Sequence, residues 1–212
     1  MAYSQNSIDA VIIGGGHNGL VCAYYLATKG LKVHVYEKRS IVGGAAITEE
    51  FHPGFKNSVA SYTVSLLNPE IIKDMNLKGY GLKIVKRPIS NFLPIDSSTY
   101  LKLGGGLERT QEEFRRFSAR DAARLPEYYD RIEAVADVLR DLSIKTPPNP
   151  KQGIKAALNA ALQLWPIATK GNQVHRDVYD LFTKSARSFL DSWFENEHIK
   201  AAFGFDSIVG NF

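Results

Sequence analysis

The first third of the chain carries two short apolar runs separated by a segment of helical periodicity. Residues 8–13 and 31–36 are mostly apolar and β-branched, a composition typical of strands buried on both faces of a parallel sheet. Residues 17–29 have the period of a helix, and Gly30 is well placed as its C-terminal cap. The pattern therefore predicts a β-α-β unit, whose helix presents one apolar face: Leu20, Ala23, Tyr24 and Ala27.

Short strands and then helices are predicted after this unit. Residues 47–67 are interpreted as a loop with a short strand or turn, and a helix is expected over 68–75 with Pro69 in its first turn. Alternation at 82–86, 91–95 and 100–103 indicates a small antiparallel or mixed sheet. The glycine triplet 104–106 lacks the lysine of a nucleoside triphosphate loop and is interpreted as a turn.

Capping signals and apolar periodicity predict helices over the remainder. Thr110 and Glu113 form a capping box that predicts a helix beginning near Gln111. A second helix is expected to begin between Ser118 and Pro126, and its predicted apolar face comprises Leu125, Tyr129, Ile132, Val135 or Ala136, Leu139 and Leu142. Further helices are expected at 153–164, 174–193 and 195–203.

Prolines at 147, 148 and 150 mark the clearest linker. They predict two regions: a Rossmann-like region over 1–146 with inserted strands and helices, and a helical lid or substrate-domain segment over 151–212. The predicted fold class is α/β, a Rossmann-like domain with a parallel sheet, a small additional sheet and a helical segment. Two interpretations of the helix at 153–164 compete. It packs on the core and substrate as a lid, or it rests on a membrane surface; its few positive charges favour packing.

Composition narrows the class of protein. Hydrophobic residues make up 44% and charged residues 23% of the 212 residues, which argues against disorder. A net charge of +4, spread along the chain, gives no clustered basic face and no indication of nucleic-acid binding. There is no signal-peptide pattern and no apolar run long enough to cross a bilayer, so a cytoplasmic location is the expectation, with peripheral membrane contact as the alternative.

The sequence offers few candidates for catalytic residues or metal ligands. Cys22 is the only cysteine, so dithiol redox chemistry is excluded, and we expect it to be a small buried residue facing the sheet. The five histidines have no metal-ligand spacing, and no nucleophile elbow is present. No catalytic residue and no metal ligand is assigned.

A glycine-rich turn follows the first predicted strand. Gly14, Gly16 and Gly19 have G-x-G-x-x-G spacing. Gly14 permits the tight turn, Gly16 leaves room for a pyrophosphate beside the backbone, and Gly19 allows the helix to pack closely on the strand. The amides of Gly15, Gly16, His17 and Asn18 are expected to face the anion, in front of the positive end of the helix dipole.

Glu37 ends the second strand, 18 residues after Gly19. An acidic residue at about this distance accepts hydrogen bonds from the adenosine ribose hydroxyls and repels the 2′-phosphate of NADP. The neighbouring Lys38 and Arg39 soften this argument slightly. Gly43, Gly44 and Ala45 allow a bulky ligand to approach. These residues alone leave both FAD and NAD open as cofactors.

Residues 9–67 resemble the phytoene dehydrogenase-related FAD oxidoreductases, and within them the branch called pyridine nucleotide-disulfide oxidoreductase domain-containing protein 2. The resemblance is carried by the glycine turn, by the run Glu37-Lys-Arg-Ser-Ile-Val-Gly-Gly-Ala-Ala and by Pro53-Gly-Phe-Lys-Asn-Ser-Val-Ala-Ser-Tyr. It implies that Gly14, Gly16, Gly19 and Glu37 hold the ADP half of FAD and that Gly43 and Gly44 follow its flavin side. Ser58, Ser61 and Tyr62 either face flavin or substrate or, as we favour, pack and form turns.

The resemblance also implies an activity: transfer of a hydride from an apolar organic substrate to flavin. Members of the family are much longer, so the chain is expected to be an N-terminal fragment. Two alternatives stay open: an NAD-dependent dehydrogenase that uses the same turn, and a nucleotide- or partner-binding chain without turnover.

Overall fold

The computed structural model describes residues 7–61, 63–64, 66–147, 149 and 153–208. Its contacts divide the chain into two compact units, Met1–Val85 (unit 1) and Lys86–Phe212 (unit 2). The linker predicted from the prolines falls elsewhere, inside unit 2, and Pro148 and Pro150 lie outside the described residues. The predicted regions 1–146 and 151–212 stay a prediction, while the contacts group the second small sheet with the helices that follow it.

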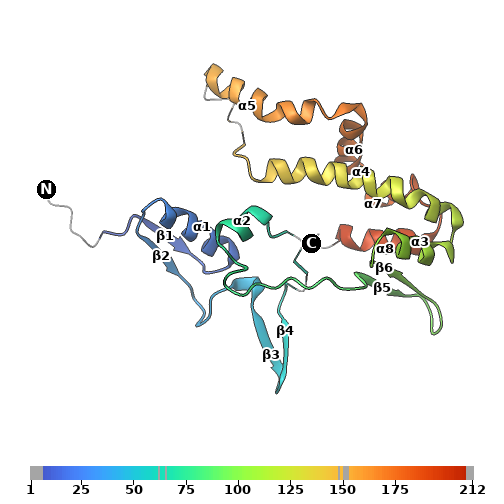
Figure 1. Cartoon of the computed structure of the whole chain (residues 1–212), viewed down its shortest axis with the longest axis horizontal. Helices are drawn as coiled ribbons and strands as arrows, with labels where there is room; N and C mark the ends of the chain where they lie inside the picture. The colour runs from blue at the N-terminus through green and yellow to red at the C-terminus, as the bar shows by residue number, and fades with distance from the viewer. Residues whose placement is uncertain (1–6, 62, 65, 148, 150–152, 209–212) are drawn as a thin grey trace. The chain divides into compact units, whose positions relative to one another are not determined.

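Unit 1 begins with the predicted β-α-β unit (Figure 1). Strand β1 (Ala10–Ile13), helix α1 (His17–Thr28) and strand β2 (Val33–Tyr36) follow one another, and the two strands pair in parallel with Ala10 opposite Val33. Helix α1 ends as expected, because Gly30 takes a positive φ of 84° and its amide donates to the carbonyl of Ala27. The predicted Rossmann-like α/β fold is confirmed.

One face of the β1–β2 sheet is exposed, which corrects the prediction of strands buried on both faces. Ile12 lies beside α1 at the position of Gly19, whereas Val11 and Ile13 on the opposite face are 55% and 83% exposed. Tyr36 of β2, which is paired with Ile13 and lies on the same face, is 56% exposed. A single helix covers a single face, and among the described residues of unit 1 no second layer covers the other.

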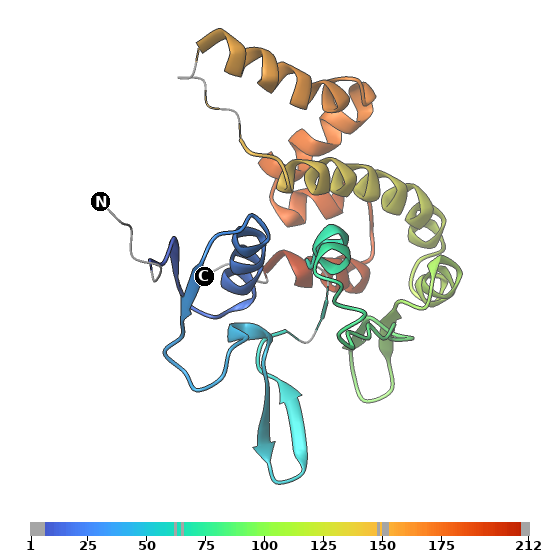
Figure 2. The same ribbon diagram turned by 60° about the vertical axis from the view of Figure 1, so that its left-hand side comes forward.

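The segment after Gly43 and Gly44, the second glycine pair, forms a hairpin that the sequence did not predict (Figure 2). A short 3-10 turn, η1 (Gly44–Ala46), leads into the antiparallel strands β3 (Thr48–His52) and β4 (Phe55–Ser58). Gly54 has a positive φ of 80° in the connecting turn, and its amide donates to Oε1 of Glu50. The strands are exposed along most of their length, so their sequence lacks the apolar alternation that indicates a half-buried strand.

Helix α2 (Pro69–Asp74) forms in unit 1 as predicted. The side chain of Asn68 caps it by accepting from the amide of Glu70 at 2.9 Å, and Pro69 occupies the first turn. The Tyr24 hydroxyl donates to the carbonyl of Asp74, and the Tyr25 hydroxyl donates to its carboxylate at 2.8 Å. Helices α1 and α2 are therefore joined through one residue.

Unit 2 pairs a small sheet with a set of helices. Strands β5 (Asn91–Pro94) and β6 (Tyr100–Leu103) are antiparallel as predicted, while residues 82–86 do not form the expected strand. The helices are α3 (Leu107–Arg115), α4 (Ala119–Ser143), α5 (Gly153–Ala168), α6 (Gly171–Thr183), α7 (Ala186–Asp191) and α8 (Glu197–Ile208).

Two helix predictions in unit 2 are wrong. Helix α3 begins at Leu107, so Thr110 is not its cap; the buried hydroxyl accepts from the amide of Gly104 and donates to the carbonyl of Gly106. The helix expected over 174–193 is two helices, because Ser185 takes an extended conformation and caps α7 through the amide of Ser188. Both errors come from hydroxyl residues, which serve equally well as caps and as partners of nearby backbone.

The core of unit 2 is aromatic and lies between β6 and the helices. Leu101 and Phe114 are fully buried, and the ring of Tyr128 contacts the stacked rings of Phe194 and Phe203 with centroid distances of 5.0 and 4.9 Å. Helix α4 begins at Ala119, within the expected range and directly after its cap Ser118, and buries Leu125 and Val135 as expected. Its buried face also includes Tyr128 and Val138, which the predicted apolar stripe omitted.

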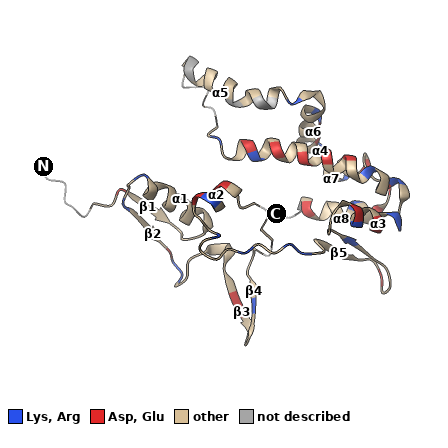
Figure 3. Cartoon of the chain, in the orientation of Figure 1, with Lys and Arg blue, Asp and Glu red and all other residues tan. Residues whose placement is uncertain are grey.

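Most charges of α4 are solvated, as expected, and Figure 3 shows both signs along the helix. The exception is Asp121, which is fully buried and accepts from the amides of Glu195 and Asn196. A second link joins α4 to α6, where Arg131 donates from Nε to the buried carboxylate of Asp177 at 3.0 Å. These buried carboxylates have partners, as buried charges require.

Candidate dinucleotide-binding site

The glycine turn lies between the end of β1 and the start of α1, where a Rossmann-like fold binds phosphate. Gly14 has a φ of 101°, a conformation that side chains disfavour, and its amide extends the strand ladder by donating to the carbonyl of Tyr36 at 2.7 Å. A Cβ on Gly19 would lie 2.1 Å from the carbonyl oxygen of Gly14. Gly14 is thus required by backbone conformation, and Gly19 by the close approach of α1 to the turn.

Gly16 differs from both, because the protein itself does not require a glycine there. Its φ of −73° and ψ of 173° suit any residue. A Cβ on Gly16 would meet only the Cα of Gly44, at an ordinary contact distance of 3.8 Å. The absence of a side chain at Gly16 therefore leaves space that no other part of the described chain fills.

The second glycine pair packs directly against this turn. The amide of Gly43 donates to the carbonyl of Gly15 at 2.7 Å, and Gly16 and Gly43 form a parallel bridge. A Cβ on Gly44 would lie 2.9 Å from the Cα of Gly16, and Gly44 has a φ of 57°. Two motifs that are almost 30 residues apart in the sequence thus form one glycine-lined surface.

Glu37 lies against the same turn, directly after β2. Its Oε2 accepts from the amide of Gly15 at 2.6 Å, and its Oε1 accepts from the amide of Arg39 at 2.9 Å. These hydrogen bonds, that from Arg39 first and that from Gly15 next, hold the pKa of Glu37 below its ordinary value. The carboxylate is therefore charged at neutral pH, and it keeps lone-pair capacity to accept a hydrogen bond from a ligand.

The amide of Gly15 corrects one detail of the sequence interpretation. It was expected to face an anion together with the next three amides, but it donates to Glu37. The first hydrogen bond of α1 runs from the amide of Leu20 to the carbonyl of Gly16. The amides of His17, Asn18 and Gly19 precede this bond and have no intrahelical acceptor. No side chain caps α1, and its first turn contains no acidic residue.

The remaining residues assigned from the sequence surround this surface. His17 and Asn18 are exposed in the first turn of α1, and Lys38 is exposed after β2. Ala45 is exposed in η1, next to Gly44. All eleven assigned positions thus lie on the turn, on the residues after β2 or on the second glycine pair: Gly14, Gly15, Gly16, His17, Asn18, Gly19, Glu37, Lys38, Gly43, Gly44 and Ala45.

Other sequence-based expectations for this unit have mixed outcomes. Cys22 is exposed, so its assignment to a buried position facing the sheet is wrong. The hydroxyl of Ser58 accepts from the amide of Ser61 at 2.9 Å, which is the turn role we favoured for both residues. Tyr62 lies outside the described residues. Within the described part of the chain, no group of three or more metal-ligating side chains is found.

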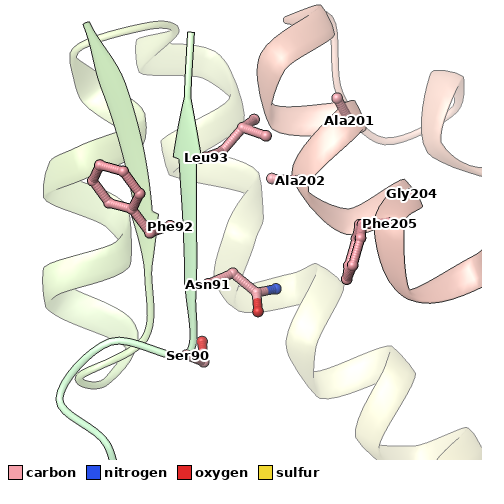
Figure 4. A pocket seen from close by; sticks show the side chains of 8 residues that line it. All are labelled: Ser90, Asn91, Phe92, Leu93, Ala201, Ala202, Gly204 and Phe205. Atoms are coloured by element: carbon pink, nitrogen blue, oxygen red, sulfur yellow. The ribbon is translucent and has the colours of Figure 1, made fainter. Parts of the chain in front are cut away.

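Unit 2 has a cavity of its own, between β5 and α8 (Figure 4). Its volume is about 490 Å³, and its lining is mainly apolar, with Phe92 and Leu93 on the strand and Ala202 and Phe205 on the helix. Asn91 places an amide beside Phe205. This cavity is not evident from the sequence, because its walls come from segments about 110 residues apart whose apolar residues also fit an ordinary core.

Comparisons with known proteins agree with the geometry of the turn. Residues 12–75 match the family described as NAD(P)-binding Rossmann-like domain. Pyridine nucleotide-disulfide oxidoreductase domain-containing protein 2 of Rattus norvegicus is 37% identical over 95% of this chain. The same protein of Mus musculus is also 37% identical over 95% of the chain, and 4,4'-diapolycopen-4-al dehydrogenase of Metabacillus indicus is 26% identical over 93% of it. The chain spans 37%, 37% and 38% of these three relatives, respectively.

Proposed function

From its Rossmann-like dinucleotide-binding domain and its relationship over 95% of its length to pyridine nucleotide-disulfide oxidoreductase domain-containing protein 2, we propose that this protein is an FAD-dependent oxidoreductase of the phytoene dehydrogenase-like class. The comparisons support a redox-enzyme family and a dinucleotide-binding domain for this chain. FAD as the cofactor and an apolar substrate are the proposal.

The observation that carries the proposal is the open space at Gly16. A position where the protein tolerates a Cβ and nevertheless has a glycine fits a ligand that approaches the backbone closely. The bound pyrophosphate would be held by the first-turn amides of α1, and the adenosine ribose hydroxyls by the lone-pair capacity of Glu37 that its backbone donors leave free. A charged Glu37 disfavours a 2′-phosphate, so FAD and NAD fit this turn better than NADP.

The second glycine pair favours FAD over NAD. Gly43 and Gly44 extend the glycine-lined surface beyond the turn that binds ADP in either cofactor. Bound FAD supplies the redox chemistry as the acceptor of a hydride or its equivalent. This chain's residues bind the cofactor: the Gly15 and Arg39 amides orient Glu37, and the packing of Gly44 on Gly16 fixes the second loop.

The cavity between β5 and α8 supports an apolar substrate. Its lining offers aromatic and aliphatic surface, and the amide of Asn91 can donate one hydrogen bond to a polar end of the ligand. Phe205 is 53% exposed, so Phe205→Asp should leave the fold intact and weaken the binding of a fluorescent hydrocarbon probe. Phe182→Asp, at a 68% exposed position outside this cavity, is the matched control and should bind the probe normally.

Equilibrium binding of FAD, NAD and NADP to the purified chain tests the cofactor assignment. We expect FAD to bind more tightly than NAD, and NADP to bind most weakly. Preference for NAD would favour a nicotinamide-dependent dehydrogenase, while binding of all three with equal, weak affinity would favour a nucleotide-binding chain without turnover.

A further inference from the structure

Helix α5 exposes an apolar stripe. Leu158, Leu162 and Trp165 are spaced by four and three residues, so they lie on one face of the helix. Their exposed fractions are 60%, 72% and 67%. None of the described residues of α5 belongs to the buried cluster of unit 2. The described residues of α5 thus contribute nothing to the buried core, and the packing on core and substrate that the sequence favours for this helix stays a prediction.

All charged residues in the segment around α5 are Lys or Arg. From residue 142 to residue 176 there is no Asp or Glu, while five cations are present: Lys145, Lys151, Lys155, Lys170 and Arg176. The remaining 21 basic and 22 acidic residues of the chain leave a net charge of −1. The segment thus carries five positive charges and no negative charge, against a net charge of +4 for the whole chain, and Figure 3 shows no acidic residue on the described part of α5.

Within α5 itself Lys155 is the one cation, and the other four flank the helix in the sequence. The exposed apolar stripe and these flanking cations resemble those of a helix that lies in the plane of an anionic membrane surface. Such helices combine a Leu- and Trp-rich face with Lys or Arg and contain few acidic residues. Tryptophan favours the interface between lipid and water, where Trp165 would lie near the C-terminal end of α5. No helix in the described part of the chain is long and apolar enough to cross a membrane. At 16 residues, α5 is about 24 Å long, which suits contact with one surface.

We propose that α5 is a membrane-docking helix, which inserts Leu158, Leu162 and Trp165 into the interface of an anionic lipid surface while the surrounding cations contact lipid headgroups. The choice of a lipid surface over a protein partner rests on charge complementarity. The segment has positive charge on both sides of the apolar stripe and no acidic residue to repel anionic headgroups. This inference goes beyond the proposed redox function and does not depend on it.

Tryptophan fluorescence provides a local readout. The chain has two tryptophans, and Trp193 is buried in unit 2 beneath Arg124 and Arg131 at 5.1 and 4.8 Å. Trp165 is 67% exposed, so a blue shift on mixing with vesicles reports the surroundings of α5. With vesicles of equal parts phosphatidylcholine and phosphatidylglycerol we expect a blue shift and co-sedimentation. With pure phosphatidylcholine we expect affinity lower by roughly tenfold or more.

Variants distinguish docking through the apolar stripe from non-specific adsorption of the protein to vesicles. Leu158→Gln/Leu162→Gln retains Trp165 as the probe and should lower the affinity for anionic vesicles by roughly a hundredfold. Leu66→Gln/Val85→Gln, at positions 95% and 82% exposed outside α5, is the matched control and should bind like the unmodified chain. Circular dichroism should show the same helix content in all three proteins, because the substituted side chains are exposed.

Three results would overturn the proposal. One is equal binding to phosphatidylcholine and anionic vesicles, and another is full binding by Leu158→Gln/Leu162→Gln. The third is an absence of vesicle binding, in which case ultracentrifugation decides what covers the stripe. Self-association that this variant abolishes would assign the stripe to a second copy of the chain.

Discussion

The backbone amide of Gly15 donates a 2.6 Å hydrogen bond to Oε2 of Glu37, joining the glycine turn to the residue expected to bind ribose. The two residues are 22 positions apart and meet because β1 and β2 are parallel neighbours that end at the same edge. The carboxylate is thus oriented by the protein before any nucleotide binds, which lowers the cost of ordering it on binding.

Glu37→Gln should weaken FAD and ADP binding about tenfold to a hundredfold, because it removes the charge from the hydrogen bonds to ribose. The amides of Arg39 and Gly15 hold the pKa of Glu37 below its ordinary value of 4.5. The charged form is therefore fully present above pH 4.5, and its contribution to affinity should disappear only as the pH falls through the lowered pKa. Titration calorimetry at several pH values checks this; an affinity that is the same in Glu37→Gln would show that Glu37 does not contact the ribose.

Gly16→Ala should fold normally and bind nucleotide poorly. The added methyl group has ordinary contacts within the protein but occupies the space assigned to pyrophosphate, so we expect at least about a tenfold loss of ADP affinity. The free energy of unfolding should fall by less than about 1 kcal/mol, the range of an altered N-terminal cap. Denaturant unfolding and ADP titration on the same sample separate the two effects. Unchanged affinity would mean that no ligand approaches Gly16.

Gly19→Ala is the complementary variant, with an effect on stability. Its Cβ would lie 2.1 Å from the carbonyl oxygen of Gly14, so α1 would have to move away from the turn. We expect unit 1 to lose about 1–3 kcal/mol, the usual cost of overpacking. Urea unfolding monitored by circular dichroism measures this loss. A variant as stable as the unmodified chain would contradict the close packing of helix and turn.

Tyr128 should make unit 2 sensitive to alkali. Burial raises the pKa of its hydroxyl from 10.0 to about 12. In the unfolded chain the hydroxyl loses its proton near pH 10, so the stability that depends on the neutral form is present below that pH and is lost as the pH rises towards 12. Tyr128→Phe should remove part of this dependence. Measuring the free energy of unfolding of both proteins between about pH 9 and pH 11 tests this dependence. Identical slopes of the free energy of unfolding against pH would refute burial of Tyr128 as the cause.

Much of unit 1 was predictable because its signals are local. The period of residues 17–29 and the cap at Gly30 predict α1, and Asn68 with Pro69 predicts α2. The contacts that assemble the site were less accessible. The packing of Gly44 on Gly16 depends on a loop returning to the turn, and the use of the Gly15 amide by Glu37 depends on the parallel register.

The errors also have physical causes. An apolar, β-branched strand indicates burial on both faces, yet burial needs a second layer that the described residues of unit 1 do not supply, and Ile13 stays 83% exposed. Thr110 has the spacing of a capping box, but the Gly104–Gly106 turn leads directly into α3 and makes it an internal residue. The hairpin at residues 48–58 was missed because its strands are exposed and carry no apolar alternation.

The central claim, that the glycine turn and Glu37 hold FAD, is tested most directly by the absorption spectrum of the purified chain, together with identification of the nucleotide released on denaturation. We predict flavin absorbance and release of FAD in stoichiometric amount. Release of NAD in its place, or a colourless protein that binds neither added FAD nor ADP, would contradict the assignment.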